Sequence, residues 1–155
     1  MKDGIKIQGF SRVQITEDGK VVGDSGFVGP NQITNGGFLY YLCHLLGASA
    51  GSKLVGYVAL GTGGTIATNA TALAGEIMGS TQRVAPTYAN VGSTTAQFTA
   101  TFSSSASFLT GASNLSNIGL FQSSAEASIF CGNTFASSSC NINQNVNVTY
   151  QIRFS

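Results

Sequence analysis

Apolar and polar residues alternate one by one along several short stretches of this chain, and this pattern limits the folds that it can adopt. In residues 96–102, Ala and Phe alternate with Gln and Thr. In residues 146–154, Val, Tyr, Ile and Phe alternate with Asn, Thr, Gln and Arg. Because successive side chains of a β-strand point to opposite faces, a period of two predicts strands that are buried on one face.

Weaker alternation near the start of the chain predicts a hairpin. Ile7 and Val13 belong to short alternating stretches, and Asp18-Gly19 follows before Val21-Val22. An Asp-Gly pair between apolar stretches is a strong signal for a two-residue turn. Charged residues crowd this region, whose composition differs from the rest. We therefore interpret residues 1–30 as an N-terminal arm or hairpin that is part of the same unit as residues 31–155.

Three other apolar stretches do not alternate, and we interpret them as buried strands. Residues 54–60 are apolar at both parities, which predicts a strand buried on both faces. Residues 118–121 and 127–130 predict two shorter strands, with a turn between them.

Helical spacing occurs in one place. From Phe38 to Leu46 the apolar residues recur every three or four positions, which predicts one short helix near residues 35–47. Thr34 or Asn35 would cap its start. A further helical turn is expected over residues 71–77.

Together these elements predict a mainly β protein. We count about seven to nine short strands separated by turns rich in Gly, Ser and Asn, which is typical of an antiparallel β-sandwich or jelly-roll-like fold. The length of 155 residues suits a single domain with its own core.

Charged residues make up 8% of the sequence, against about 25% in an average soluble domain. The net charge is +1 and no basic patch is visible, so we expect no nucleic-acid partner. No apolar stretch approaches the roughly 20 residues of a membrane-spanning helix, and no secretory signal follows Met1. We therefore expect synthesis in the cytoplasm and no membrane partner. Few charges also mean weak repulsion between copies, which suits a protein that assembles.

Residues that could carry chemistry are few and separated. His44 is the one histidine, and Cys43 beside it would point about 100° away on a helix, so His44 is interpreted as structural. Glu76 and Glu126 are the only acidic residues after position 24, and nothing in their spacing brings them together. Residues 61–64 (Gly-Thr-Gly-Gly) lack the Lys of a phosphate-binding loop and predict a tight turn with positive φ. We therefore expect no enzymatic activity, no cofactor and no metal site.

Two pairs of residues are expected to meet for structural reasons. Glu76 and Arg83 are isolated charges in an almost uncharged part of the chain, which predicts an ion pair, within the domain or across a subunit boundary. Cys131 and Cys140 could form a disulfide if they face each other across a hairpin, although a cytoplasmic origin argues against it. Cys43 lies among leucines and is expected to be buried.

Aromatic residues raise the question of sugar binding, because carbohydrate-binding sandwiches stack sugars on exposed rings. The chain has no Trp, and its ten Phe fall mainly at the inward positions of the expected strands. Tyr40 and Tyr41 lie on the expected helix. Filling of the core is the favoured interpretation of these rings.

One segment resembles a pattern of a known class of proteins. Residues 57–76 read YVALGTGGTIATNATALAGE. This resembles tailed-phage virion structural proteins, in which a buried strand ends in Gly-Thr-Gly and is followed by a small-residue loop, Thr-x-Leu-x-x-Glu and an Arg. The matching positions here are Gly61, Thr62, Gly63, Thr71, Leu73, Glu76 and Arg83.

The resemblance extends in order over residues 33–155. Its further parts are residues 33–38 (ITNGGF), 117–121 (NIGLF), 133–135 (NTF) and the alternating stretch 146–154. Two features depart from the family. Residues 64–69 contain no Pro, and residues 141–145 replace the usual Gly-Asp turn.

The resemblance implies a non-enzymatic virion protein that is made in the host cytoplasm. A capsid decoration (cement) protein is the favoured role, with copies of itself and the major capsid protein as partners, a trimer as the expected symmetry and residues 1–30 as an arm. A tail, fibre or baseplate component with tail proteins as partners is one alternative. A carbohydrate-binding surface module is another.

Overall fold

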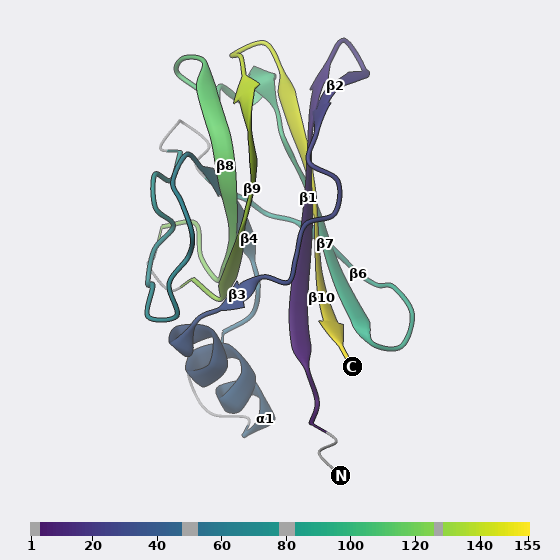
Figure 1. The fold of residues 1–155 in the computed structure, drawn as a ribbon, viewed down its shortest axis with the longest axis vertical. Helices are drawn as coiled ribbons and strands as arrows, with labels where there is room; N and C mark the ends of the chain where they lie inside the picture. Colours follow the sequence, from purple (N-terminus) through teal and green to yellow (C-terminus); the bar gives the residue numbers. More distant parts are fainter. Residues whose placement is uncertain (1–3, 48–52, 78–82, 126–128) are drawn as a thin grey trace.

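The computed structural model describes residues 4–47, 53–77, 83–125 and 129–155, and within them the chain forms two antiparallel five-stranded sheets. The sheets pack face to face as a sandwich (Figure 1). The first sheet has the order β2-β1-β10-β7-β6 and the second has the order β3-β9-β8-β4-β5. The strands are β1 (Ile7–Glu17), β2 (Lys20–Asp24), β3 (Gln32–Ile33), β4 (Tyr57–Gly61), β5 (Arg83–Val84), β6 (Thr87–Asn90), β7 (Thr95–Phe102), β8 (Ser113–Phe121), β9 (Cys131–Cys140) and β10 (Asn145–Phe154). The expected mainly β antiparallel sandwich is confirmed.

The N-terminal hairpin is built into the first sheet. β1 pairs with β10 from Ile7 opposite Phe154 to Thr16 opposite Asn145, and it lies second from the edge of the sheet. The expected turn is present, because Asp18 and Gly19 have φ values of 49° and 75° and connect β1 to β2. Residues 7–24 thus form a hairpin that is paired into the first sheet, and contact of this region with a neighbouring molecule stays a prediction.

Alternation places one face of each long strand in the core. In β10, Val146, Val148, Tyr150 and Ile152 are buried. The second sheet presents Leu115, Ile118 and Leu120 of β8 to the same core. Burial of such side chains stabilises the fold by about 1.5–3 kcal/mol each, which makes this inter-sheet layer the main source of stability.

Both faces of β4 are covered, as its sequence predicts. Val58 and Leu60 point into the main core, whereas Ala59 joins a second cluster on the outer face with Ile66 and Leu73. The loop after β4 supplies this outer cover. Residues 71–77 form turns in that loop and not the expected helical turn, because the segment folds back antiparallel to the end of β4.

The strand expected at residues 127–130 is absent from the part of that range that the structure describes, and the next strand, β9, begins at Cys131. Ile129 and Phe130 lie outside any strand, and β9 runs ten residues. Residues 127 and 128 of that expected strand lie outside the described residues.

The expected helix is present at residues 35–46, and its central part is wide. A π-helix, η1 (Gly37–Cys43), continues into α1 (His44–Leu46). Thr34 caps the start, since its Oγ1 accepts a hydrogen bond of 2.9 Å from the Gly37 amide. The helix lies at one end of the sandwich, near the start of β1 and the end of β10, and the β1–β2 turn lies at the other end (Figure 1).

Candidate functional site

The predicted pair of isolated charges does meet. Arg83 Nε donates to Glu76 Oε1 at 2.7 Å, and Arg83 Nη2 donates to Glu76 Oε2 at 3.1 Å. Both side chains are almost buried, with exposed fractions of 6% and 11%. Arg83 Nη1 also donates to the Ser123 carbonyl at 2.9 Å, and its guanidinium lies 3.6 Å from the ring centre of Phe121.

This ion pair ties three segments together. Glu76 ends the loop after β4, Arg83 begins β5, and Ser123 follows β8. These contacts link the three segments, which supports a structural role for the pair. Glu126, the other acid considered in the sequence, lies outside the described residues.

The cysteines do not form the disulfide considered above. Cys131 and Cys140 are the first and last residues of β9. Nine steps of about 3.3 Å separate them by roughly 30 Å, and a disulfide needs Cα atoms within about 7 Å. Both thiols are buried and free. Cys43 was expected to be buried and is instead exposed on the helix.

The Gly-rich segment 61–64 serves close packing and not positive φ. A Cβ on Gly63 would lie 2.2 Å from the Ala74 carbonyl oxygen, and one on Gly61 would lie 2.4 Å from Asn117 Oδ1. The left-handed glycine of this loop is Gly75, with φ of 64°. The expectation of positive φ at residues 61–64 is therefore wrong, because these glycines admit the returning half of the loop.

An apolar groove lies between the helix and the end of the first sheet. Its volume is about 140 Å³. Leu42 and Leu45 of the helix, Leu54 and Val55 after it, and Phe154 of β10 are among its walls. Lys53 is the one charged residue of its described lining.

The surface around the groove is strongly apolar. Leu46 is 89% exposed, Leu54 is 68% exposed and Leu45 is 56% exposed. We call this surface, with the groove, the apolar end. Exposed apolar patches of this kind mark binding sites, because a monomer gains nothing by keeping large aliphatic groups in water.

The four sheet edges differ in how well they are protected. β2 carries the charges of Lys20 and Asp24, and Asp24 pairs with Arg12 at 2.6 Å. β3 and β5 have two residues each. β6 has four exposed residues and no charged side chain. Charge and shortness protect an edge against pairing with another chain, so β6 is the open one.

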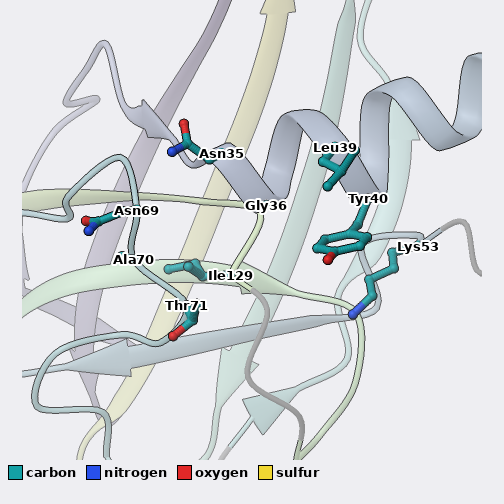
Figure 2. A pocket seen from close by; sticks show the side chains of 9 residues that line it. All are labelled: Asn35, Gly36, Leu39, Tyr40, Lys53, Asn69, Ala70, Thr71 and Ile129. Atoms are coloured by element: carbon teal, nitrogen blue, oxygen red, sulfur yellow. The ribbon is translucent and has the colours of Figure 1, made fainter.

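A second pocket, of about 460 Å³, lies beside the helix and shares Lys53 with the groove. Helix, loop and neighbouring segments all contribute to it (Figure 2). Its lining includes Asn35, Tyr40, Lys53, Asn69, Thr71 and Ile129.

Tyr40, Asn35 and Thr71 were noted in the sequence as an aromatic residue, a helix cap and a position of the Thr-x-Leu-x-x-Glu pattern, but not as members of one site. Lys53 did carry a signal, since it is the only charged residue between Asp24 and Glu76. Asn69 could not be distinguished in a chain so rich in Asn and Thr. The convergence of these residues depends on the path of the loop after β4.

His44 lies on the helix and its ring meets the edge of the Tyr40 ring, with centres 5.6 Å apart. Within the described ranges, no three His, Cys, Asp or Glu side chains group closely enough to hold a metal ion. None of the helices in those ranges is long and apolar enough to cross a membrane.

Comparison of the chain with protein-family models, with curated proteins and with solved structures finds no match.

Proposed function

We propose that the protein is a non-enzymatic structural component of a tailed-phage particle. In this proposal it is a capsid decoration protein that is made in the host cytoplasm and stabilises the shell. It associates with copies of itself, as a trimer, and binds the major capsid protein. The resemblance of residues 33–155 to virion proteins supports the assignment to a phage particle. The apolar end supports the proposed self-association.

The apolar end is the main support for the proposed self-association. Its exposed leucines surround a groove with one charged residue in its described lining. Removal of apolar surface from water contributes about 25 cal/mol per Å², and charged residues are depleted at the centres of protein interfaces. A second copy of the same chain suits this surface, because Lys53 is the only charge that the described lining of each groove brings to the interface.

The edge strand β6 extends this surface. Tyr88 of β6 packs against Phe98 of β7, with ring centres 5.6 Å apart, and Phe98 lines the groove. β6 is uncharged, so it sets up no repulsion against a neighbouring copy.

Light scattering with and without empty capsids tests the proposal. The monomer mass is 15.9 kDa, so a trimer should scatter as three times that mass. The Leu45→Lys, Leu46→Lys double variant should be monomeric, because two ammonium groups would have to be buried at the interface. The Val21→Lys, Val22→Lys double variant is the control, since both valines are 54% exposed at the other end of the molecule.

Sedimentation with empty capsids separates the roles. Co-sedimentation at a copy number that matches the lattice, together with a higher melting temperature of the shell, supports the decoration role. A stable oligomer that ignores capsids and binds tails supports the tail, fibre or baseplate alternative. A monomer whose mass is unaffected by the Leu45 and Leu46 substitutions contradicts the assembly proposal.

A further inference from the structure

The pocket of about 460 Å³ beside the helix carries an exposed aromatic ring. Tyr40 and Tyr41 are neighbours in sequence but have different surroundings. Tyr41 is buried and stacks on Phe130, with ring centres 4.9 Å apart. Tyr40 is 42% exposed and faces the pocket (Figure 2). Its flat face can receive the C–H groups of a ring-shaped ligand.

Polar side chains lie on the other side of the pocket from this ring. Figure 2 shows the side chains of Asn35, Asn69 and Thr71 across the pocket from Tyr40, with Ile129 between them. Within the part of the chain that the structure describes, these three polar side chains make no hydrogen bond. Their two amide groups and one hydroxyl group can both donate and accept hydrogen bonds. They are therefore available to bind a ligand rich in hydroxyl groups.

Lys53 is the only charged residue in the described lining of the pocket. The Nζ atom of Lys53 lies 5.4 Å from the centre of the Tyr40 ring. No acidic residue is among the described lining. A single ammonium group is too little for a polyphosphate, and the amides are poor partners for an aliphatic ligand.

Backbone hydrogen bonds hold the pocket in shape. The Asn35 amide donates to the Thr68 carbonyl at 2.7 Å, which joins the helix to the loop after β4. The Lys53 amide donates to the Tyr40 carbonyl at 3.1 Å, and the Ile129 amide donates to the Thr71 carbonyl at 3.2 Å. Four segments are thus fixed before any ligand arrives, which reduces the entropy lost on binding.

We propose that this pocket binds a glycan. One sugar ring stacks on Tyr40, and hydroxyl groups of the glycan bond to Asn35, Asn69 and Thr71 across the pocket. Lys53 bonds to a hydroxyl group of a neutral sugar or to the carboxylate of a uronic acid. This site shares Lys53 with the groove of the apolar end, but its other lining residues differ, and its occupation does not depend on the proposed structural role.

Binding to a glycan array and titration calorimetry with the best neutral and uronic-acid oligosaccharides test the proposal. Tyr40→Ala and Asn69→Ala should each weaken binding about tenfold, because each removes a direct contact. Tyr88→Ala is the matched control, since Tyr88 is an exposed tyrosine on β6, outside the pocket, and it should leave affinity unchanged. Lys53→Met should weaken binding of the uronic acid about fivefold and leave the neutral sugar within twofold.

Two results would overturn the proposal. One is the absence of binding by the wild-type protein to any neutral or uronic-acid glycan of the array. The other is wild-type affinity in both Tyr40→Ala and Asn69→Ala, with unchanged melting temperatures. The Leu45→Lys, Leu46→Lys variant should keep its affinity per site when monomeric, so failure of the assembly proposal and failure of the glycan proposal are told apart.

Discussion

The guanidinium of Arg83 is held on three sides. Glu76 accepts two hydrogen bonds from it, the Ser123 carbonyl accepts a third, and the Phe121 ring covers its face. The attraction of its partners offsets the free energy needed to remove a buried charge from water. Without the partners that free energy is not offset, and the folded state is destabilised.

Arg83→Met is therefore expected to lower the free energy of unfolding by about 3–5 kcal/mol, because the Glu76 carboxylate would be left almost buried and unpaired. Urea denaturation at neutral pH measures the loss. The matched control is Arg12→Met in the exposed Arg12–Asp24 pair, where the expected loss is below about 1 kcal/mol. Addition of Glu76→Gln to Arg83→Met should recover part of the stability. A loss no larger than that of the control would contradict the structural role.

The two buried thiols predict that the protein is less stable at alkaline pH. Burial raises the pKa of Cys131 to about 12 and that of Cys140 to about 11. An unfolded thiol loses its proton near pH 8.5, so the folded state holds protons that the unfolded chain has released. Stability is full below that pH and falls as the pH rises toward the folded pKa values, by roughly 2 kcal/mol between pH 8.5 and 9.5 for the two thiols.

Urea denaturation at pH 7.5, 8.5 and 9.5 checks this slope. Cys131→Ala should flatten it by about half, since one of the two titrating thiols is removed. The exposed Cys43 provides the control, because Cys43→Ser should leave the slope as it is. A stability that stays constant to pH 9.5 would show that the two thiols are not shielded from water.

Some of these residue contacts could be predicted from the sequence and others could not. The Glu76–Arg83 pair was predictable because isolated charges in an almost uncharged part of the chain need a partner of opposite charge if they are buried. The position of Cys131 and Cys140 was not, since residues 131–140 (CGNTFASSSC) lack the alternation that would have marked a single long strand. Small residues are tolerated in the second half of β9 because Ala136, Ser137 and Ser139 are exposed, while the strand pairs with β8.

The elements that could be predicted are those whose burial leaves a regular pattern in the sequence. β7 and β10 alternate cleanly because one face of each packs in the core. The helix was predicted from its leucines, but its π-helical turns depend on a contact far away in sequence. A Cβ on Gly37 would lie 2.2 Å from the Phe130 carbonyl oxygen, so the glycine lets the helix approach the second sheet.

Two glycines at the start of the helix should therefore respond differently to substitution. Gly37→Ala is expected to lower the free energy of unfolding by about 1–3 kcal/mol, because its Cβ would overlap the Phe130 backbone. Gly36→Ala is the matched control. The nearest atoms to its Cβ are 3.8 Å away, so alanine should stabilise the helix by about 0.5–1 kcal/mol. Thermal and urea denaturation measure both. Equal effects would show that the helix does not approach Phe130 so closely.

At the scale of the whole molecule, the two ends of the sandwich differ in character. The β1–β2 turn carries Asp18 and Lys20 on an edge that charge protects. The other end carries the helix, the groove and the exposed leucines, and the edge strand β6 extends it. The two sheets hold these ends apart along the long axis (Figure 1). A molecule built this way can bind at its apolar end while its charged end stays in water.

This division predicts how the proposed self-association responds to solvent. Because the apolar end has few charges, an increase of sodium chloride from about 50 to about 500 mM should change the association constant less than twofold, since there is little charge attraction to screen. Ammonium sulfate should strengthen the association and cooling toward 5 °C should weaken it, because burial of apolar surface is favoured by excluded salts and weakens in the cold. Sedimentation velocity over a concentration series measures each constant. Dissociation of the oligomer in sodium chloride would mean that charged groups hold the copies together, and the contact would then have to be sought at the β1–β2 end, where charges of both signs lie on the surface.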